Sequence, residues 1–243
     1  MDKKSNLRKF IYLTNFEVSS VLMKTLVAVG LLVIVQLVAF VAVITNEANE
    51  YLRFEELADM AGYSISFYIA GFVILGITGF CFYKNWLGSK SIYSLLCLPV
   101  RRAFVYFSKL TAAVISILIL IVAQVANIFL SYGFYLFAIP SIPKVRNGLV
   151  LSFIRWDFLK LFYPSDLFGL LNTITYIIVA AASVLFLIIL ERSGHYQKAL
   201  MLIIASVIIV LLPFPFGNWL NWSLVALQLG IGSLKLLNEG SIA

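Results

Sequence analysis

The chain has 243 residues, of which 62% are hydrophobic and only 12% are charged, and its formal net charge is +7. Soluble domains carry about a quarter of their residues as charged side chains. The composition therefore excludes a water-soluble globular protein and predicts an all-α integral membrane protein. Lysine and arginine mainly set the topology of a membrane chain, so the positive charge does not indicate a nucleic-acid partner.

The N-terminal segment 1–24 is basic and alternates charged with apolar residues at helical spacing. Phe10, Leu13, Phe16 and Ser20 fall on one side of such a helix, a pattern typical of amphipathic helices that lie in the membrane interface. We expect an interfacial helix on the cytoplasmic side, and the alternative is a cytoplasmic extension of the first membrane helix. The apolar stretch that follows is too long for the core of a cleavable signal peptide.

Six apolar segments are candidates for membrane-spanning helices, because about 20 apolar residues in a helix cross a hydrocarbon core of roughly 30 Å. The third stays apolar as far as Ile139, which is longer than one crossing needs. Glycines interrupt the last, which leaves open whether it spans or re-enters the membrane. The predicted helices cover residues 25–45, 63–83, 104–133, 167–190, 199–217 and 219–237.

The distribution of positive charge predicts the orientation. With the N-terminus in the cytoplasm, most of the 18 Lys and Arg residues fall on the cytoplasmic side, as the positive-inside rule requires. Both termini are then cytoplasmic. The first outside loop, 46–59, is acidic, and we expect Glu55 and Glu56 to form a solvated loop face there. An intramembrane metalloprotease site is rejected because no span carries a histidine.

The connection 84–103 between the second and third helices contains no acidic residue and carries Lys90, Arg101 and Arg102. Its apolar residues predict a short amphipathic helix over 86–98, which ends before Pro99 because proline breaks a helix. Such a helix can present a mixed surface to a cytoplasmic protein. Alternatively, its basic residues contact anionic lipid headgroups.

Neutral polar residues are almost the only polar groups in the predicted spans. Gln36 stands alone in the first span, and one face of the third carries Ser116, Gln124, Asn127 and Ser131. This stripe predicts either a translocation path or subunit seam, or hydrogen bonds between packed helices, which contribute about 0.6 kcal/mol each on average. Both interpretations stay open, with the second favoured.

The segment 139–166, between the third and fourth helices, predicts an amphipathic helix on the outer leaflet. Leu149, Phe153, Trp156 and Leu159 fall on one side of it, with Phe162 or Tyr163 in line with them.

The sequence offers no catalytic, cofactor-binding or metal-binding residues. It contains no phosphate-binding glycine-rich loop, and its single histidine, His195, lies in a short connection with no cluster of ligands around it. Cys81 and Cys97 are expected to be reduced. We therefore expect no enzymatic activity in this chain, and another chain must supply the energy for any transport.

Two patches, “SKSIYSLLCLPVRRAFVYFSKL” (89–110) and “NFEVSSVLMK” (15–24), carry motifs of one known family. They resemble type-2 ABC exporter permeases, the membrane-spanning subunits of ATP-driven exporters. Arg101 departs mildly from the family, which often has Ser or Thr there, and “NFEVSSVLMK” (15–24) resembles its interface helix, where a glutamate is common near Glu17. The likeness elsewhere is limited to chain length and six-helix topology. In “SKSIYSLLCLPVRRAFVYFSKL” (89–110) the matching residues are Tyr93, Leu95, Leu96, Leu98, Pro99, Arg102, Ser108, Lys109 and Leu110.

The resemblance implies a permease in a bacterial cell membrane that pairs with a second permease subunit, identical or homologous. Each permease would seat its coupling helix on a separate cytoplasmic ABC ATPase subunit, two copies in all, which binds ATP and magnesium. The residues expected to couple to the ATPase are Trp86, Lys90, Tyr93, Leu95, Leu96, Leu98, Pro99, Arg101 and Arg102, with Phe16 and Glu17 in the interfacial helix.

The expected substrate is an amphipathic or antimicrobial peptide, or a lipid-like compound, either exported or removed to confer immunity. The alternative function is a non-transporting scaffold or sensor subunit that recruits a cytoplasmic partner. An ion-coupled carrier is disfavoured, since such carriers bury ionisable groups near the membrane midplane.

Overall fold

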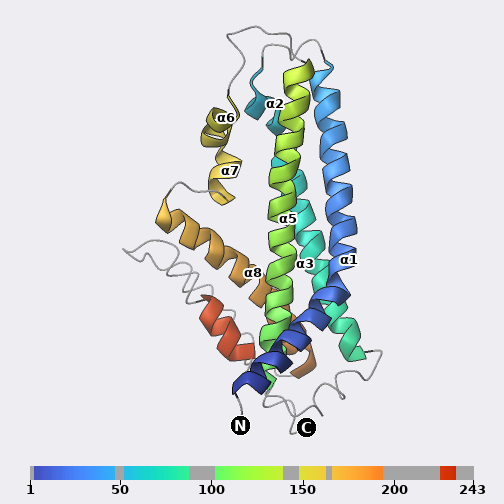
Figure 1. Ribbon diagram of the computed structural model, residues 1–243, viewed down its shortest axis with the longest axis vertical. Helices are drawn as coiled ribbons and strands as arrows, with labels where there is room; N and C mark the ends of the chain where they lie inside the picture. Colours follow the sequence, from blue (N-terminus) through green and yellow to red (C-terminus); the bar gives the residue numbers. More distant parts are fainter. Residues whose placement is uncertain are drawn as a thin grey trace. The chain divides into compact units, whose positions relative to one another are not determined.

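The computed structural model describes residues 3–46, 52–87, 102–138, 148–162, 166–193 and 225–233. All regular structure in these ranges is helical (Figure 1). The helices are α1 (Lys3–Ile44), α2 (Phe54–Met60), α3 (Tyr63–Leu87), α5 (Arg102–Ala138), α6 (Leu149–Arg155), α7 (Asp157–Phe162) and α8 (Leu167–Ser193), and residues 225–233 are also helical.

Four of these helices are long and apolar enough to cross a membrane: Arg8–Ile44 in α1, Tyr63–Lys84 in α3, Ala103–Phe137 in α5 and Leu167–Ile189 in α8. They confirm the prediction of a helical chain with several apolar spans and indicate a multi-pass membrane protein. The predicted span 199–217 lies outside the described residues, and only residues 225–233 of the predicted span 219–237 lie within them.

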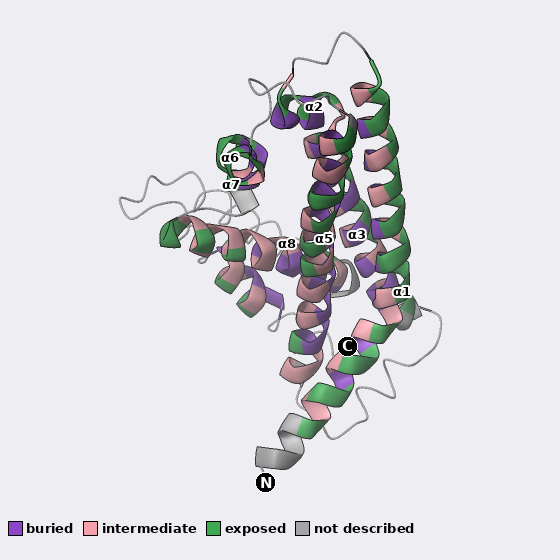
Figure 2. Cartoon of the chain, turned by 45° about the horizontal axis from the view of Figure 1, so that its top comes forward, coloured by how far each residue is buried: buried purple, intermediate pink, exposed green. Residues whose placement is uncertain are grey.

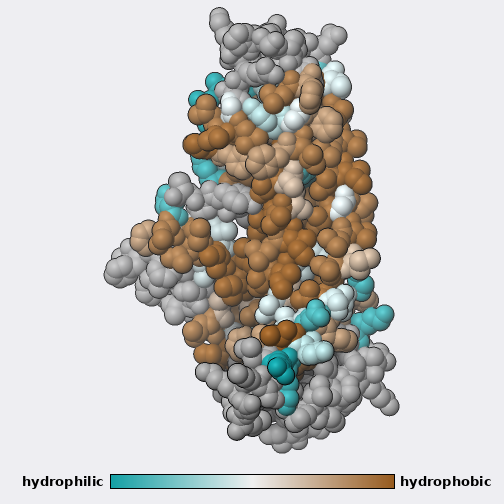
Figure 3. Space-filling model, in the orientation of Figure 1, coloured by the Kyte–Doolittle hydropathy of each residue, from teal (hydrophilic) through white to brown (hydrophobic). Residues whose placement is uncertain are grey.

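The N-terminal segment is part of a longer helix. The sequence suggested an interfacial helix followed by a span at 25–45, but α1 runs without interruption from Lys3 to Ile44. Within the predicted span, Val27, Leu31, Val38 and Val41 are exposed at helical spacing, and Figure 2 shows exposed and buried positions recurring along α1. Apolar side chains dominate the visible surface of the long helices in Figure 3. An exposed apolar stripe of this kind suits a helix that faces lipid.

The chain divides into two compact units, the first formed by Met1–Met23, Leu75–Ile117 and Leu171–Ala243. Its core combines α1, α3, α5, α8 and the helical residues 225–233. Small residues allow close packing: Ala181 and Ala182 are buried, and a Cβ added at Gly79 would lie 3.2 Å from Cγ1 of Val184. The hydrophobic effect contributes little to helix association inside lipid. Helices in membranes therefore associate through close packing, which small residues allow.

The second unit comprises Lys24–Ile74 and Leu118–Leu170. Its core contains a cluster of aromatic rings in which Phe54 of α2 packs edge-on against Phe40, Tyr132, Tyr135 and Trp156, with centroid distances of 5.3–6.3 Å. Such edge-to-face pairs add to the stabilisation that burial provides.

The acidic loop predicted over 46–59 is partly helical, which corrects the expectation for Glu55. The helix α2 begins at Phe54 after Arg53, whose backbone amide donates to Glu56 Oε2 at 3.1 Å. Glu55 is only 9% exposed and therefore does not belong to a solvated face. The aromatic cluster explains this result, since burying Phe54 and Leu57 draws the first turn of α2 inward.

The outside segment forms two short helices rather than the single amphipathic helix that was predicted. The helix α6 ends at Arg155, the backbone of the next residue, Trp156, is extended (φ −76°, ψ 109°), and α7 begins at Asp157. The indole Nε1 of Trp156 donates to Asp59 Oδ1 at 2.8 Å. Trp156 and Leu159 are buried in the second unit, so the break lets the Trp156 ring enter the aromatic cluster.

Candidate functional site

A buried ion pair in the first unit joins the two patches that carry the family resemblance. Lys109 Nζ lies 2.7 Å from Glu17 Oε1, and the side chains of Lys109 and Glu17 are 7% and 0% exposed. Glu17 comes from the N-terminal part of α1, and Lys109 from the second turn of α5. Sequence reasoning placed both residues at the cytoplasmic side but did not pair them.

The ammonium group of Lys109 also contacts α3. Its Nζ lies 4.6 Å from the centroid of the Phe82 ring, a distance at which the ring quadrupole attracts a cation. A small cavity of about 30 Å³ borders the same residues, together with Tyr106 and Leu185. Lys109 therefore links three helices, with a hydrogen-bonded carboxylate on α1 and an aromatic face on α3.

Only one of the two carboxylate oxygens of Glu17 accepts a hydrogen bond in this site. Oε1 accepts from Lys109, whereas Oε2 is buried and has no hydrogen-bond partner among the described residues. The sequence carried a signal for a buried site, because the apolar residues Leu13 and Val21 lie four positions before and after Glu17 and so share its helix face. Phe16, expected to act with it, is 55% exposed and points out of the core.

The predicted coupling segment lies almost entirely outside the described residues. The helix α3 ends at Leu87 and includes Trp86, and α5 begins at Arg102, but neither side chain is described. Seven of the residues expected to couple to the ATPase lie outside the described ranges: Lys90, Tyr93, Leu95, Leu96, Leu98, Pro99 and Arg101.

A second polar site lies in the core of the other unit. Gln36 Nε2 donates to Ser66 Oγ at 2.7 Å and to the carbonyl of Tyr63 at 3.3 Å. Asn127 Nδ2 donates to Gln36 Oε1 at 2.7 Å, and the hydroxyls of Tyr63 and Ser131 bond to each other. Helices α1, α3 and α5 are thus tied together by neutral hydrogen bonds.

The predicted polar stripe on α5 is not a single site. Ser116 belongs to the first unit and donates to the carbonyl of Ala112 on its own helix, at 3.0 Å. Asn127 and Ser131 join the network around Gln36. Gln124 is 3% exposed, yet its amide nitrogen and oxygen have no hydrogen-bond partner among the described residues. Sequence reasoning missed Tyr63 and Ser66, whose only signal was their polarity at the start of a span.

Neither site is arranged for bond-breaking chemistry in the part of the chain that the structure describes. No group of three or more His, Cys, Asp or Glu residues gathers there, and the Cys81 thiol is buried. The two sites hold helices together, and one of them pairs two buried charges near the end of α3 and the start of α5. Comparison of the chain with family models, with curated proteins and with solved structures found no match to any of them.

Proposed function

We propose that the chain is the membrane-spanning permease subunit of an ATP-driven ABC exporter. In this proposal a separate ATPase docks on the coupling helix 86–98, and two permease subunits, identical or homologous, form the transport path. The substrate proposed is an amphipathic or antimicrobial peptide, or a lipid-like compound, which leaves a bacterial cell. Both termini face the cytoplasm.

The observation that carries the proposal is the ion pair between Glu17 and Lys109. The segment 86–98 begins in the last two residues of α3 and precedes α5 in the chain, so its movement would act on the end of one helix and the start of the other. Lys109 binds Glu17 only seven residues into α5, and it contacts Phe82 near the end of α3. A force on the segment would therefore reach the N-terminal part of α1 as well.

Buried charge makes this connection stiff. Separating Glu17 from Lys109 would leave an uncompensated charge in a medium of low dielectric constant, which costs several kcal/mol. Val21, Phe82 and Tyr106 pack in the same core cluster, so these helix ends behave as one packed body. A permease driven by an ATPase needs such a rigid group of packed helices next to the docking segment in the chain, because the group transmits the movement of that segment.

The first experiment is purification of the full chain from native membranes in mild detergent, followed by mass spectrometry and an ATPase assay. We expect an ABC ATPase to co-purify with the wild-type chain. The double variant L95S/L96S removes the predicted docking contacts and is expected to reduce the recovered ATPase at least tenfold.

The matched control is V150S/L151S, which makes the same kind of change at exposed positions of α6, on the predicted outer side. It should retain the ATPase. Equal recovery with both double variants would contradict docking on 86–98. Recovery of a cytoplasmic partner without ATPase activity would favour the alternative function, a scaffold or sensor that recruits a partner through the same segment.

A further inference from the structure

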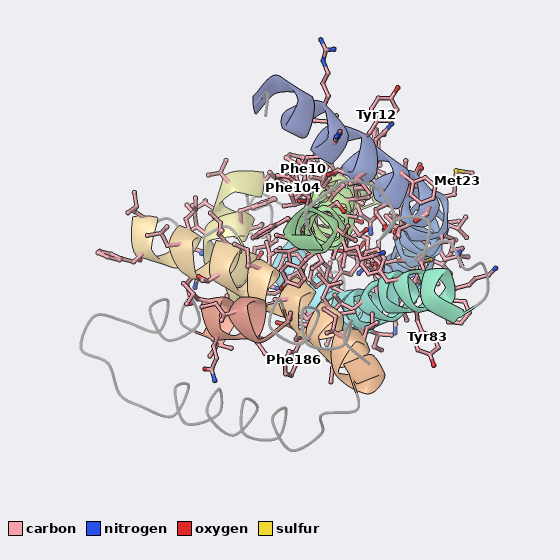
Figure 4. The ribbon with its side chains drawn as sticks, turned by 90° about the horizontal axis from the view of Figure 1, so that it is seen from below. Phe10, Tyr12, Met23, Tyr83, Phe104 and Phe186 are labelled. Atoms are coloured by element: carbon pink, nitrogen blue, oxygen red, sulfur yellow. The ribbon has the colours of Figure 1, made fainter. Side chains whose placement is uncertain are left out.

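An apolar groove of about 410 Å³ lies along the N-terminal part of α1, in the first unit. The groove is lined by Phe10, Ile11, Tyr12, Thr14, Asn15, Val18 and, from α5, Ile115. Phe10 is held in place by Phe104 of α5, with ring centroids 6.1 Å apart. Figure 4 shows these two rings close together, while Tyr12 projects away from the neighbouring helices.

The groove is open and mostly apolar, which narrows the class of its occupant. Tyr12 is 81% exposed, and Ile11 is 56% exposed. An apolar surface of this kind is unfavourable against water, and it suits a hydrocarbon chain. Tyr12 has an apolar ring and a polar hydroxyl, the combination found where side chains lie at the level of lipid headgroups.

Positive charge is placed at one end of the groove. Arg8, which is exposed, shares a helix face with Ile11 and Tyr12, since residues three and four positions apart are neighbours on a helix. Asn15, which lines the groove, lies seven positions after Arg8 and therefore on the same face of the helix. The groove therefore offers apolar walls for an acyl chain and one cation for an anionic headgroup.

We propose that this groove binds an anionic phospholipid, with one acyl chain against Phe10, Thr14, Val18 and Ile115 and its phosphate near Arg8. The site goes beyond the proposed transport function and does not depend on it. A lipid held there would sit between α1 and α5 and would belong to the structure of the first unit rather than to the bulk bilayer.

The test is native mass spectrometry of the full chain in detergent, titrated with phosphatidylglycerol or phosphatidylcholine that carry identical dioleoyl chains. We expect the first bound lipid to be phosphatidylglycerol. In R8Q its affinity should fall roughly fivefold, since each basic residue near a lipid surface contributes about fivefold. The control R155Q removes one exposed arginine elsewhere and should change the affinity less than twofold.

A second pair of variants tests the acyl-chain part of the site. Asn15 lines the groove but is exposed, so N15W fills the groove while leaving the packed core intact, and N15A leaves the groove open. We expect N15W to lose the first bound lipid at least tenfold and N15A to bind as the wild type does. Equal binding of the two lipids, unchanged affinity in R8Q or unchanged affinity in N15W would each overturn the proposal.

Discussion

At the scale of single residues, Glu17 and Lys109 form a buried ion pair in the described part of the first unit. Both groups are buried, and each is acceptable there only because the other is present. Replacing one partner leaves a buried charge alone, which typically costs 3–5 kcal/mol, whereas replacing both by apolar or neutral groups of similar shape is often nearly neutral.

We therefore expect each single variant, Lys109→Met or Glu17→Gln, to destabilise the chain more than the double variant does. Lys109→Met leaves the carboxylate unpaired and should lower the free energy of unfolding by about 3–5 kcal/mol. The double variant Glu17→Gln/Lys109→Met should recover most of that loss. Thermal unfolding of the full chain in one detergent measures both, and additive losses in the double variant would refute the coupling between the two groups.

Gln124 presents the opposite case, a buried polar side chain whose atoms find no partner among the described residues. An unsatisfied buried amide costs about 1–3 kcal/mol, so Gln124→Leu is expected to raise the thermal midpoint. Asn127→Leu on the same helix breaks the bond to Gln36 and is expected to lower it. A lower midpoint for Gln124→Leu would mean that the amide is hydrogen-bonded in the membrane.

At the scale of elements, the junction between α2 and α3 depends on one glycine. Gly62 has φ +74° and links the end of α2 to the start of α3. A Cβ added there would meet no atom within 4 Å, so the cost of Gly62→Ala is conformational rather than steric crowding. L-residues in this left-handed region are disfavoured by about 1–2 kcal/mol.

Gly62→Ala is accordingly expected to destabilise the second unit by about 1–2 kcal/mol in thermal unfolding. Gly30→Ala provides the matched control, because Gly30 also lies in the second unit and has open space around its Cβ position, but it is inside α1 and has no positive φ. It should leave stability unchanged or raise it by up to about 1 kcal/mol, since alanine is favoured over glycine in a helix interior. Equal losses in the two variants would show that the backbone angle is not the cause.

At the scale of the whole molecule, topology is the prediction with the widest consequences. In a variant without its two native cysteines, Arg53→Cys should react with a membrane-impermeant thiol reagent in intact cells, because it precedes α2 in the predicted outside loop. Lys84→Cys, exposed near the end of α3, should react only after permeabilisation. The reverse pattern would invert the orientation and place the segment 86–98 outside, where no ATPase can reach it.

The number of spans is tested in the same background with a cysteine in place of Ile242. Six spans put this position in the cytoplasm together with the N-terminus, so labelling should again require permeabilisation. Labelling in intact cells would indicate an odd number of crossings, as expected if the predicted segment 219–237 re-enters instead of spanning.

The sequence by itself determined the helical class and four of the spans. In lipid the backbone of each spanning segment must form its hydrogen bonds within that segment, which favours a helix, and the apolar side chains that lipid requires are visible in the sequence as a long apolar run. It did not predict α2 or the break at Trp156, since both depend on aromatic rings from distant helices. Glu17 and Lys109 lie 92 positions apart, and Gln36 and Asn127 lie 91 apart. Helical spacing shows which residues share a face, but only tertiary packing decides which faces meet, and both polar sites arise from that choice.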